Sequence, residues 1–144
     1  MYKHILLLTI ILLPLSVLFG QSAVSGIQFQ DITYKEAIEL SKETGKPVFI
    51  DAYTVWCGPC KYMEKKVFTD EMLGKFFNEH FINIKVEMEK DAEGPELARK
   101  YRVTGYPTLL FIDQSERIIS KQIGAVDGVI LLDVGKSVSK RLGN

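Results

Sequence analysis

The sequence is poor in cysteine, histidine and tryptophan. Its 144 residues include two cysteines, Cys57 and Cys60, two histidines and one tryptophan. Two cysteines are too few for a disulfide-stapled miniature domain, and a chain of this length can bury a core without such staples. A structural zinc site usually takes four protein ligands. We therefore expect neither a disulfide framework nor a structural metal.

The sequence also lacks a surplus of either charge. Basic and acidic residues both number 18, so the formal net charge is zero, and no repeat or low-complexity tract is present. Domains that bind nucleic acid or anionic membranes usually carry a basic excess. We therefore expect no nucleic-acid partner. Hydrophobic residues at 47% and charged residues at 25% are typical of an ordinary globular domain.

Long apolar runs are absent outside the first twenty residues. Lys3 precedes a nearly unbroken apolar stretch, residues 5–19, and Gly20 follows. This order is typical of a secretory signal peptide, and the run falls short of the ~20 apolar residues that a membrane helix needs. We expect residues 1–20 to be a signal peptide cleaved after Gly20, with Ala23 as an alternative site. An uncleaved membrane anchor is the rival interpretation. A signal peptide implies that the protein is exported, to the periplasm or cell envelope.

Both cysteines lie in one short motif, Trp56-Cys57-Gly58-Pro59-Cys60. An apolar, β-prone run precedes it over residues 48–53, interrupted only by Asp51, and residues 61–68 contain no glycine or proline and can continue a helix. A cysteine pair with this spacing between a strand and a helix indicates redox chemistry. A purely structural disulfide is the alternative, but a loop this short stabilises a fold weakly.

The expected geometry assigns a task to each cysteine. At a helix N-terminus, unpaired N–H groups and the helix dipole favour the thiolate of Cys57. Cys60 follows three residues later on the same face, roughly 5–6 Å away between Cα atoms, which is within disulfide range. We expect Cys57 to attack a partner's disulfide and Cys60 to resolve the mixed disulfide. Pro59 suits the first helical turn, and Gly58 leaves room for another chain.

Hydrophobic periodicity and capping residues predict alternating strands and helices. The expected elements are a helix between a capping box at residues 33–36 and Gly45, a strand at 48–53, a helix after Cys57, a helix from Thr69 or Asp70 to about 79, a strand at 81–86, a helix at 95–101, strands at 108–112 and 118–123, and a final helix capped by Asp127. This order predicts an α/β fold with helices on both faces of a mixed sheet. His80 is expected to be solvated at a helix end.

The motif residues also resemble a known family, the thioredoxins. The resemblance rests on Trp-Cys-Gly-Pro-Cys-Lys, on Asp51 six residues before the first cysteine, and on the later Gly105-Tyr106-Pro107-Thr108. It covers about residues 30–142. It implies a thioredoxin-like fold with a mixed central sheet, in which residues 21–30 form a flexible lead-in and residues 31–144 the domain.

The resemblance implies roles for several further residues. Asp51 matches a buried aspartate that exchanges protons with the second cysteine, here Cys60; the alternative is a strand-end residue bonded to backbone. Lys85 matches a lysine near that carboxylate, or is a solvated strand lysine. Pro107 matches a cis-proline packed against the cysteine pair, or merely begins a strand.

Two aromatic residues are expected to line the site by the same resemblance. Trp56 matches a tryptophan that walls the site, with a core aromatic as the alternative. Tyr106 precedes the matched proline, where thioredoxins usually carry an aliphatic residue, and its backbone is expected to face the client chain. Gly124 and Ala125 match a glycine region near the same groove only weakly.

The sequence departs from cytosolic thioredoxins in three respects. It carries an export signal and an additional N-terminal helix, and Lys65 stands about where thioredoxins have a helix-kinking proline. It looks more like exported thioredoxin-like proteins and is similar to the soluble C-terminal domain of membrane thiol–disulfide interchange reductases. We therefore expect a cofactor-free, monomeric reductase of protein disulfides in the envelope, supplied by a membrane electron donor and acting on disulfide-bearing protein clients.

Two other function classes stay open on the sequence alone. The first is a Cu(I)-binding metallochaperone that uses Cys57 and Cys60 as soft ligands. The second is a non-catalytic module that keeps the fold and holds polypeptides in its groove. The presence of Asp51 and Pro107 beside an intact cysteine pair argues against the second class.

Overall fold

The computed structural model describes residues 25–143. The predicted signal peptide, residues 1–20, and both candidate cleavage sites, Gly20 and Ala23, lie outside the described residues. No helix within the described part of the chain combines the length and the apolar character that a bilayer crossing requires.

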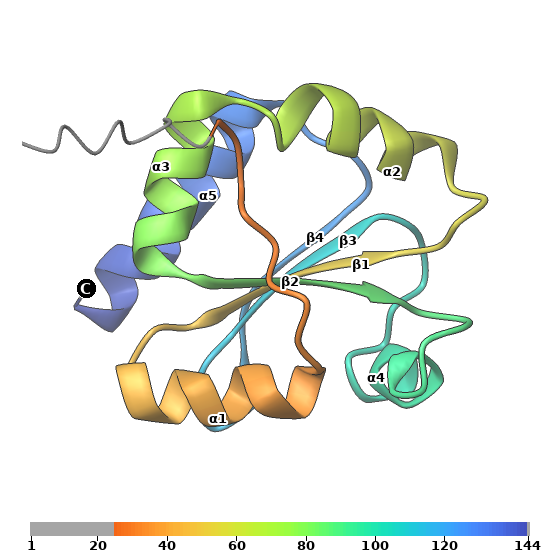
Figure 1. The fold of residues 1–144 in the computed structure, drawn as a ribbon, viewed down its shortest axis with the longest axis horizontal. Coiled ribbons are helices and arrows are strands. Elements are labelled where there is room, and N and C mark those ends of the chain that lie inside the picture. Colours follow the sequence, from red (N-terminus) through yellow and green to blue (C-terminus); the bar gives the residue numbers. More distant parts are fainter. Residues whose placement is uncertain (1–24, 144) are drawn as a thin grey trace, which may run out of the picture.

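The centre of the fold is a four-stranded mixed sheet in the order β2-β1-β3-β4 (Figure 1). Its strands are β1 (Val48–Tyr53), β2 (Ile82–Glu87), β3 (Thr108–Ile112) and β4 (Ile118–Ile123). β1 runs parallel to β2 and antiparallel to β3, and β4 is antiparallel to β3. β1 and β3 occupy the interior of the sheet, and their mainly apolar side chains are buried on both faces.

Helices cover both faces of the sheet, as the sequence predicts. They are α1 (Tyr34–Thr44), α2 (Gly58–Tyr62), its π-helical continuation η1 (Met63–Val67), α3 (Glu71–His80), α4 (Gly94–Lys100) and α5 (Gly128–Leu142). α1 and α4 lie on one side, and α2, α3 and α5 on the other (Figure 1). Successive strand residues point to opposite faces, so Ile50 packs in the α1/α4 core and Phe49 in the α3/α5 core.

Helix boundaries follow local capping chemistry. The predicted capping box at the start of α1 is present, because Thr33 and Glu36 each accept a hydrogen bond from the other's backbone N–H. Asp70 caps α3 by accepting from the N–H of Leu73 at 2.8 Å. Asp127 occupies the same position before α5, yet its side chain makes no capping hydrogen bond.

The helix that follows Cys57, made of α2 and η1 and called here the active-site helix, contains one wide turn. The N–H of Phe68 bonds to the carbonyl of Met63, five residues back, at 2.8 Å, which is π-helical rather than α-helical geometry. The sequence predicts a continuous helix over residues 61–68, and the π turn is a local irregularity within it. It includes Lys65, which stands about where the thioredoxins that this sequence resembles have a kinking proline.

The chain before α1 packs along the domain. The N–H of Ile27 bonds to Phe68 at 2.7 Å and that of Gln30 to Asn83 in β2 at 2.8 Å, and Ile27 is buried. A Cβ on Gly74 would lie 2.2 Å from the Gly26 carbonyl, so only glycine permits this close crossing of two backbones. Of the predicted flexible lead-in, residues 21–30, the described part is thus hydrogen-bonded to the domain, at Phe68 and at the edge strand β2.

Candidate active site around the cysteine pair

The two cysteines lie at the start of the active-site helix, just after the loop that follows β1. Cys57 is the N-cap of α2 and forms a disulfide with Cys60, with 5.3 Å between their Cα atoms. The Cys57 sulfur also accepts the backbone N–H of Cys60 at 3.1 Å. An N–H aimed at this sulfur, at a helix N-terminus, favours a thiolate there once the pair is reduced.

The immediate surroundings of the pair are open on one side. Gly58 and Pro59 are exposed, and a Cβ built on Gly58 would meet no other atom within 4 Å. Cys57 and Cys60 themselves are only 2% and 5% exposed. A second chain can therefore approach over Gly58, while the cysteines stay shielded from bulk solvent.

The segment around Pro107 faces the same end of the sheet. The Tyr106–Pro107 bond is cis, as the family resemblance implied, and Pro107 is buried. The Pro107 carbonyl accepts the N–H of Gly124 at 2.7 Å, which joins this segment to the end of β4. Gly124 adopts a φ of +89°, a conformation that favours glycine.

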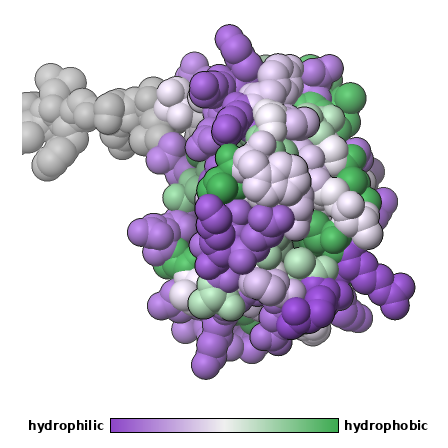
Figure 2. All heavy atoms as spheres, turned by 90° about the vertical axis from the view of Figure 1, so that its right-hand side faces the viewer, coloured by the Kyte–Doolittle hydropathy of each residue, from purple (hydrophilic) through white to green (hydrophobic). Residues whose placement is uncertain are grey.

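Trp56 and Tyr106 meet as an aromatic pair. Their rings pack edge to face with centroids 5.9 Å apart, although the two residues come from different loops. Trp56 is 61% exposed, so it is a surface residue and not part of the core. Figure 2 looks onto this end of the molecule and shows pale and green side chains interspersed with purple ones.

Asp51 is a buried carboxylate on the face of β1 that the active-site helix covers. It is 1% exposed, and neither carboxylate oxygen has a hydrogen-bond partner among the described residues. Burial raises the pKa of Asp51 to about 6, and the nearby positive charge of Lys85 opposes part of that rise. An acid with a pKa in this range can accept and return a proton near neutral pH.

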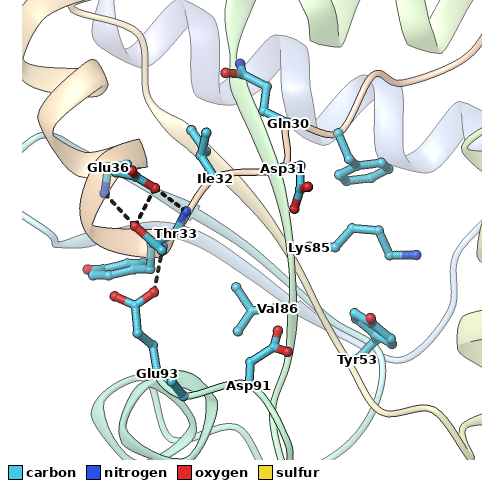
Figure 3. A pocket seen from close by; sticks show the side chains of 13 residues that line it. Gln30, Asp31, Ile32, Thr33, Glu36, Tyr53, Lys85, Val86, Asp91 and Glu93 are labelled. Atoms are coloured by element: carbon cyan, nitrogen blue, oxygen red, sulfur yellow. Dashed lines mark hydrogen bonds between the residues drawn. The ribbon is translucent and has the colours of Figure 1, made fainter.

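Lys85 connects this buried carboxylate with the surface. It lies opposite Asp51 in the neighbouring strand, with 3.6 Å between Nζ and the Asp51 carboxylate. The same Nζ is 3.3 Å from the carboxylate of Glu64, on η1, and 4.7 Å from the ring centre of Tyr53. Figure 3 shows the Lys85 side chain running beside Tyr53 at one side of a surface pocket.

Two acidic residues at this end of the sheet are absent from the sequence-based prediction. Glu87, the last residue of β2, is 3% exposed, and the carboxylate of Glu89 accepts the indole N–H of Trp56 at 3.0 Å. Nothing local in the sequence distinguishes these residues from other acids in the acidic segment 87–93. Glu64 was missed for the same reason, since its partner Lys85 is distant in sequence.

The remaining candidate residues lie away from the cysteines. His80 stacks on the Phe76 ring with centroids 4.2 Å apart, so it is half-buried at the end of α3 and not simply solvated. Within residues 25–143, no group of three or more histidine, cysteine or acidic side chains is arranged to hold a metal ion.

Sequence comparisons match the chain to one family model and to several known proteins. A family model described as a thioredoxin-like domain matches residues 34–139. The chain is 34% identical over 95 residues to the thiol:disulfide interchange protein DsbD of Yersinia pestis, covering 65% of this chain and 16% of that protein. It is 32% identical over 108 residues to the chloroplastic thioredoxin-like protein CITRX of Oryza sativa, covering 74% of this chain and 52% of that protein. The chain therefore spans only part of the length of either relative.

Two solved structures also superimpose on the chain over most of its length. A Bacteroides thetaiotaomicron protein, provisionally assigned as a disulphide-isomerase, superimposes with a TM-score of 0.70 and 42% identity over 80% of this chain and 94% of its own. A thioredoxin from Thermus thermophilus superimposes with a TM-score of 0.72 and 25% identity over 82% of this chain and 91% of its own.

Proposed function

The chain belongs to the thioredoxin-like family, and from this premise we propose that it reduces protein disulfides by cycling the Cys57–Cys60 pair between dithiol and disulfide. The observation that carries the proposal is the pair itself. It sits at a helix N-terminus, beneath an open approach over Gly58, at the end of the strand that holds the buried Asp51. A structural disulfide would need neither the open approach nor a buried acid.

The proposed cycle balances two electrons. The Cys57 thiolate attacks one sulfur of a client disulfide, forms a mixed disulfide and releases the first client thiolate. Cys60 then gives its proton to the Asp51 carboxylate and attacks the Cys57 sulfur, which releases the second client thiolate. The client gains two electrons, and the pair ends as the Cys57–Cys60 disulfide. A separate donor must return two electrons before the next cycle.

The proposed direction rests on the residues between the cysteines. Gly58 and Pro59 are the dipeptide of thioredoxin, whose couple lies near −270 mV, whereas strongly oxidising relatives lie near −120 mV. An isomerase is the second candidate, because the Bacteroides protein that shares 42% identity with this chain carries that provisional assignment.

We place the protein in the cell envelope, with disulfide-bearing proteins as clients and a membrane protein as electron donor. The signal-peptide pattern of residues 1–20 supports export. The likeness to a thiol:disulfide interchange protein supports a partner that supplies electrons, since a reductase outside the cytosol needs one.

Trapping experiments test the chemistry. A Cys60→Ala variant should accumulate a mixed disulfide through Cys57 when mixed with insulin as a disulfide-bearing probe. The matched Cys57→Ala variant should trap none. Reduction of insulin at the full rate by Cys57→Ala would overturn the proposal, and Cu(I) binding without any disulfide exchange would favour the metallochaperone.

The reduction potential tests the direction. The protein is equilibrated with glutathione buffers, and its free thiols are trapped and counted by mass spectrometry. A potential near or below about −230 mV supports a reductase, and one near about −180 mV supports an isomerase. If the pair does not cycle between dithiol and disulfide at all, the interpretation as a non-catalytic polypeptide-binding module would be favoured instead.

A further inference from the structure

Glu87 is a buried carboxylate with an unusual set of partners. It ends β2 and is 3% exposed, and its two oxygens accept three backbone N–H groups. Oε1 accepts from Val55 at 3.2 Å, and Oε2 accepts from Glu89 at 2.8 Å and from Lys90. Burial opposes ionisation of this group, but the three N–H donors outweigh it and hold the pKa of Glu87 below its ordinary value. The carboxylate is therefore charged at neutral pH.

These hydrogen bonds join two loops that are far apart in the sequence. Val55 belongs to the loop that leads from β1 to Cys57, whereas Glu89 and Lys90 follow β2. One further backbone bond joins the loops, from the N–H of Met88 to the Tyr53 carbonyl at 2.9 Å. The pairing of β1 with β2 ends at Tyr53 and Glu87, and beyond it the Glu87 side chain adds three hydrogen bonds, one of which, to Val55, reaches the loop before Cys57.

Trp56 lies on the first of these loops and is held by one residue of the second loop, Glu89, and by Tyr106 from the loop before β3. The indole N–H of Trp56 donates to Glu89 at 3.0 Å, and the indole ring packs against Tyr106. An indole that is 61% exposed would otherwise be free to change rotamer. It keeps one orientation only while the loop that carries Glu89 stays beside the loop that carries Trp56.

We propose that Glu87 is a positioning residue for client recognition: it locks the two loops together so that Glu89 holds Trp56 against Tyr106 as a fixed wall beside Cys57. The inference rests on the proposed reduction of protein disulfides, because only a polypeptide client needs this wall. Glu87 makes no contact with either sulfur. Its loss therefore weakens the binding of polypeptides and leaves the reactivity of the cysteine pair unchanged.

The chain offers a matched control in Glu93. This half-buried carboxylate also accepts two backbone N–H groups, those of Tyr34 at 2.9 Å and Lys35 at 3.3 Å, but these belong to the start of α1 (Figure 3). Glu93→Gln therefore removes a similar charge from a similar set of bonds without touching the Trp56 loop. It separates a general loss of stability from a loss of positioning.

The first measurement is independent of enzymatic activity. Trp56 is the only tryptophan, so its fluorescence reports on the wall alone. We expect Glu87→Gln and Glu89→Ala to lower its anisotropy and shift its emission to longer wavelength, because the indole becomes mobile and more hydrated. Glu89→Gln keeps an amide oxygen that can accept the indole N–H and should restore both values. Glu93→Gln should match the wild type.

The second measurement separates binding from chemistry. With insulin as client, Glu87→Gln and Glu89→Ala should raise KM about threefold to tenfold, the effect of about one lost hydrogen bond. The value of kcat, the reduction potential and the rate with oxidised glutathione should not change. Because Glu89 is exposed, its alanine variant keeps the test valid even if Glu87→Gln folds poorly.

The outcomes distinguish this inference from the proposed function. Unchanged Trp56 fluorescence in Glu87→Gln, or an equal change in Glu93→Gln, would overturn the positioning role of Glu87 whether or not the protein is a reductase. Altered fluorescence with an unchanged KM for insulin would overturn the link to client recognition. A wild-type protein that reduces no disulfide would refute the proposed function, while the fluorescence result would still decide whether Glu87 holds Trp56.

Discussion

Asp51 places a carboxyl group in the interior, where only Lys85 offsets its charge, and so makes stability depend on pH. Its pKa is 3.8 in the unfolded chain and about 6 in the folded protein, mainly because of burial. The folded state therefore binds the proton more tightly, and the free energy of unfolding falls as the pH rises from about 4 to about 6. Above that window the charged group costs about 3 kcal/mol.

We accordingly expect Asp51→Asn to stabilise the protein at about pH 8, by up to about 3 kcal/mol, and to have little effect at about pH 4. Urea unfolding of both proteins at the two pH values measures the difference. The same variant should slow the resolution of the mixed disulfide, because asparagine cannot accept the Cys60 proton. An equal stability change at both pH values would contradict the burial of a charged Asp51.

Lys85 and Glu64 should shift the pH dependence of disulfide exchange in opposite directions. Lys85 lowers the pKa of Asp51 and Glu64 raises it, the latter more weakly. We expect Lys85→Met, which keeps the apolar stem, to move the pH midpoint of client reduction upward and Glu64→Gln to move it slightly downward. Stopped-flow measurements across the pH range check both. Shifts in the same direction would show that Asp51 does not set the midpoint.

The sequence indicates the residues that we propose to react but not the residues that position them. Cys57, Cys60, Asp51 and Pro107 lie in recognisable motifs, so their approximate places follow from local spacing. Glu87 acts on Val55, 32 residues away, and only the parallel pairing of β1 with β2 brings the two together. A contact of that kind has no local pattern to reveal it.

Among the helices, two aspartates that occupy the same position before a helix differ in whether their side chains cap it. Asp70 accepts the N–H of Leu73 at 2.8 Å, whereas Asp127 makes no capping hydrogen bond. We expect Asp70→Ala to lower the free energy of unfolding by about 1 kcal/mol. Asp127→Ala, the matched control, loses only the interaction with the helix dipole and should cost a few tenths of a kcal/mol at most. Urea denaturation of both variants measures the two losses. Equal losses would contradict the conclusion that the Asp70 side chain caps α3 and the Asp127 side chain does not cap α5.

Strands were the best predicted elements, and irregular helix geometry the least. The predicted strands at 108–112 and 118–123 match β3 and β4 residue for residue, because β-prone runs are bounded there by Pro107, the 113–116 turn and Gly124. The π turn at Met63–Val67 has no such marker. It depends on how the helix packs against the sheet, which no local residue preference encodes.

Across the whole molecule, the N-terminal segment acts as a cover for the edge of the sheet. Ile27 is buried, and Phe29 packs against Phe68 and Phe49 with ring centroids 5.1 and 6.2 Å apart. The polar and small residues around them gave the segment the appearance of a flexible lead-in. The close crossing of Gly26 and Gly74, two positions far apart in the sequence, allows the segment to reach these contacts on the domain.

This cover should be measurable as stability. We expect a chain that begins at Asp31 to be about 3 kcal/mol less stable than one that begins at Ser25, because it loses the burial of Ile27 and its hydrogen bond to Phe68. It should also self-associate, since the outer edge of β2 becomes free to pair with another chain. Urea unfolding and sedimentation velocity test both effects, with the chain from Ser25 as the control. Equal unfolding midpoints for the two chains would show that the segment contributes nothing to the fold.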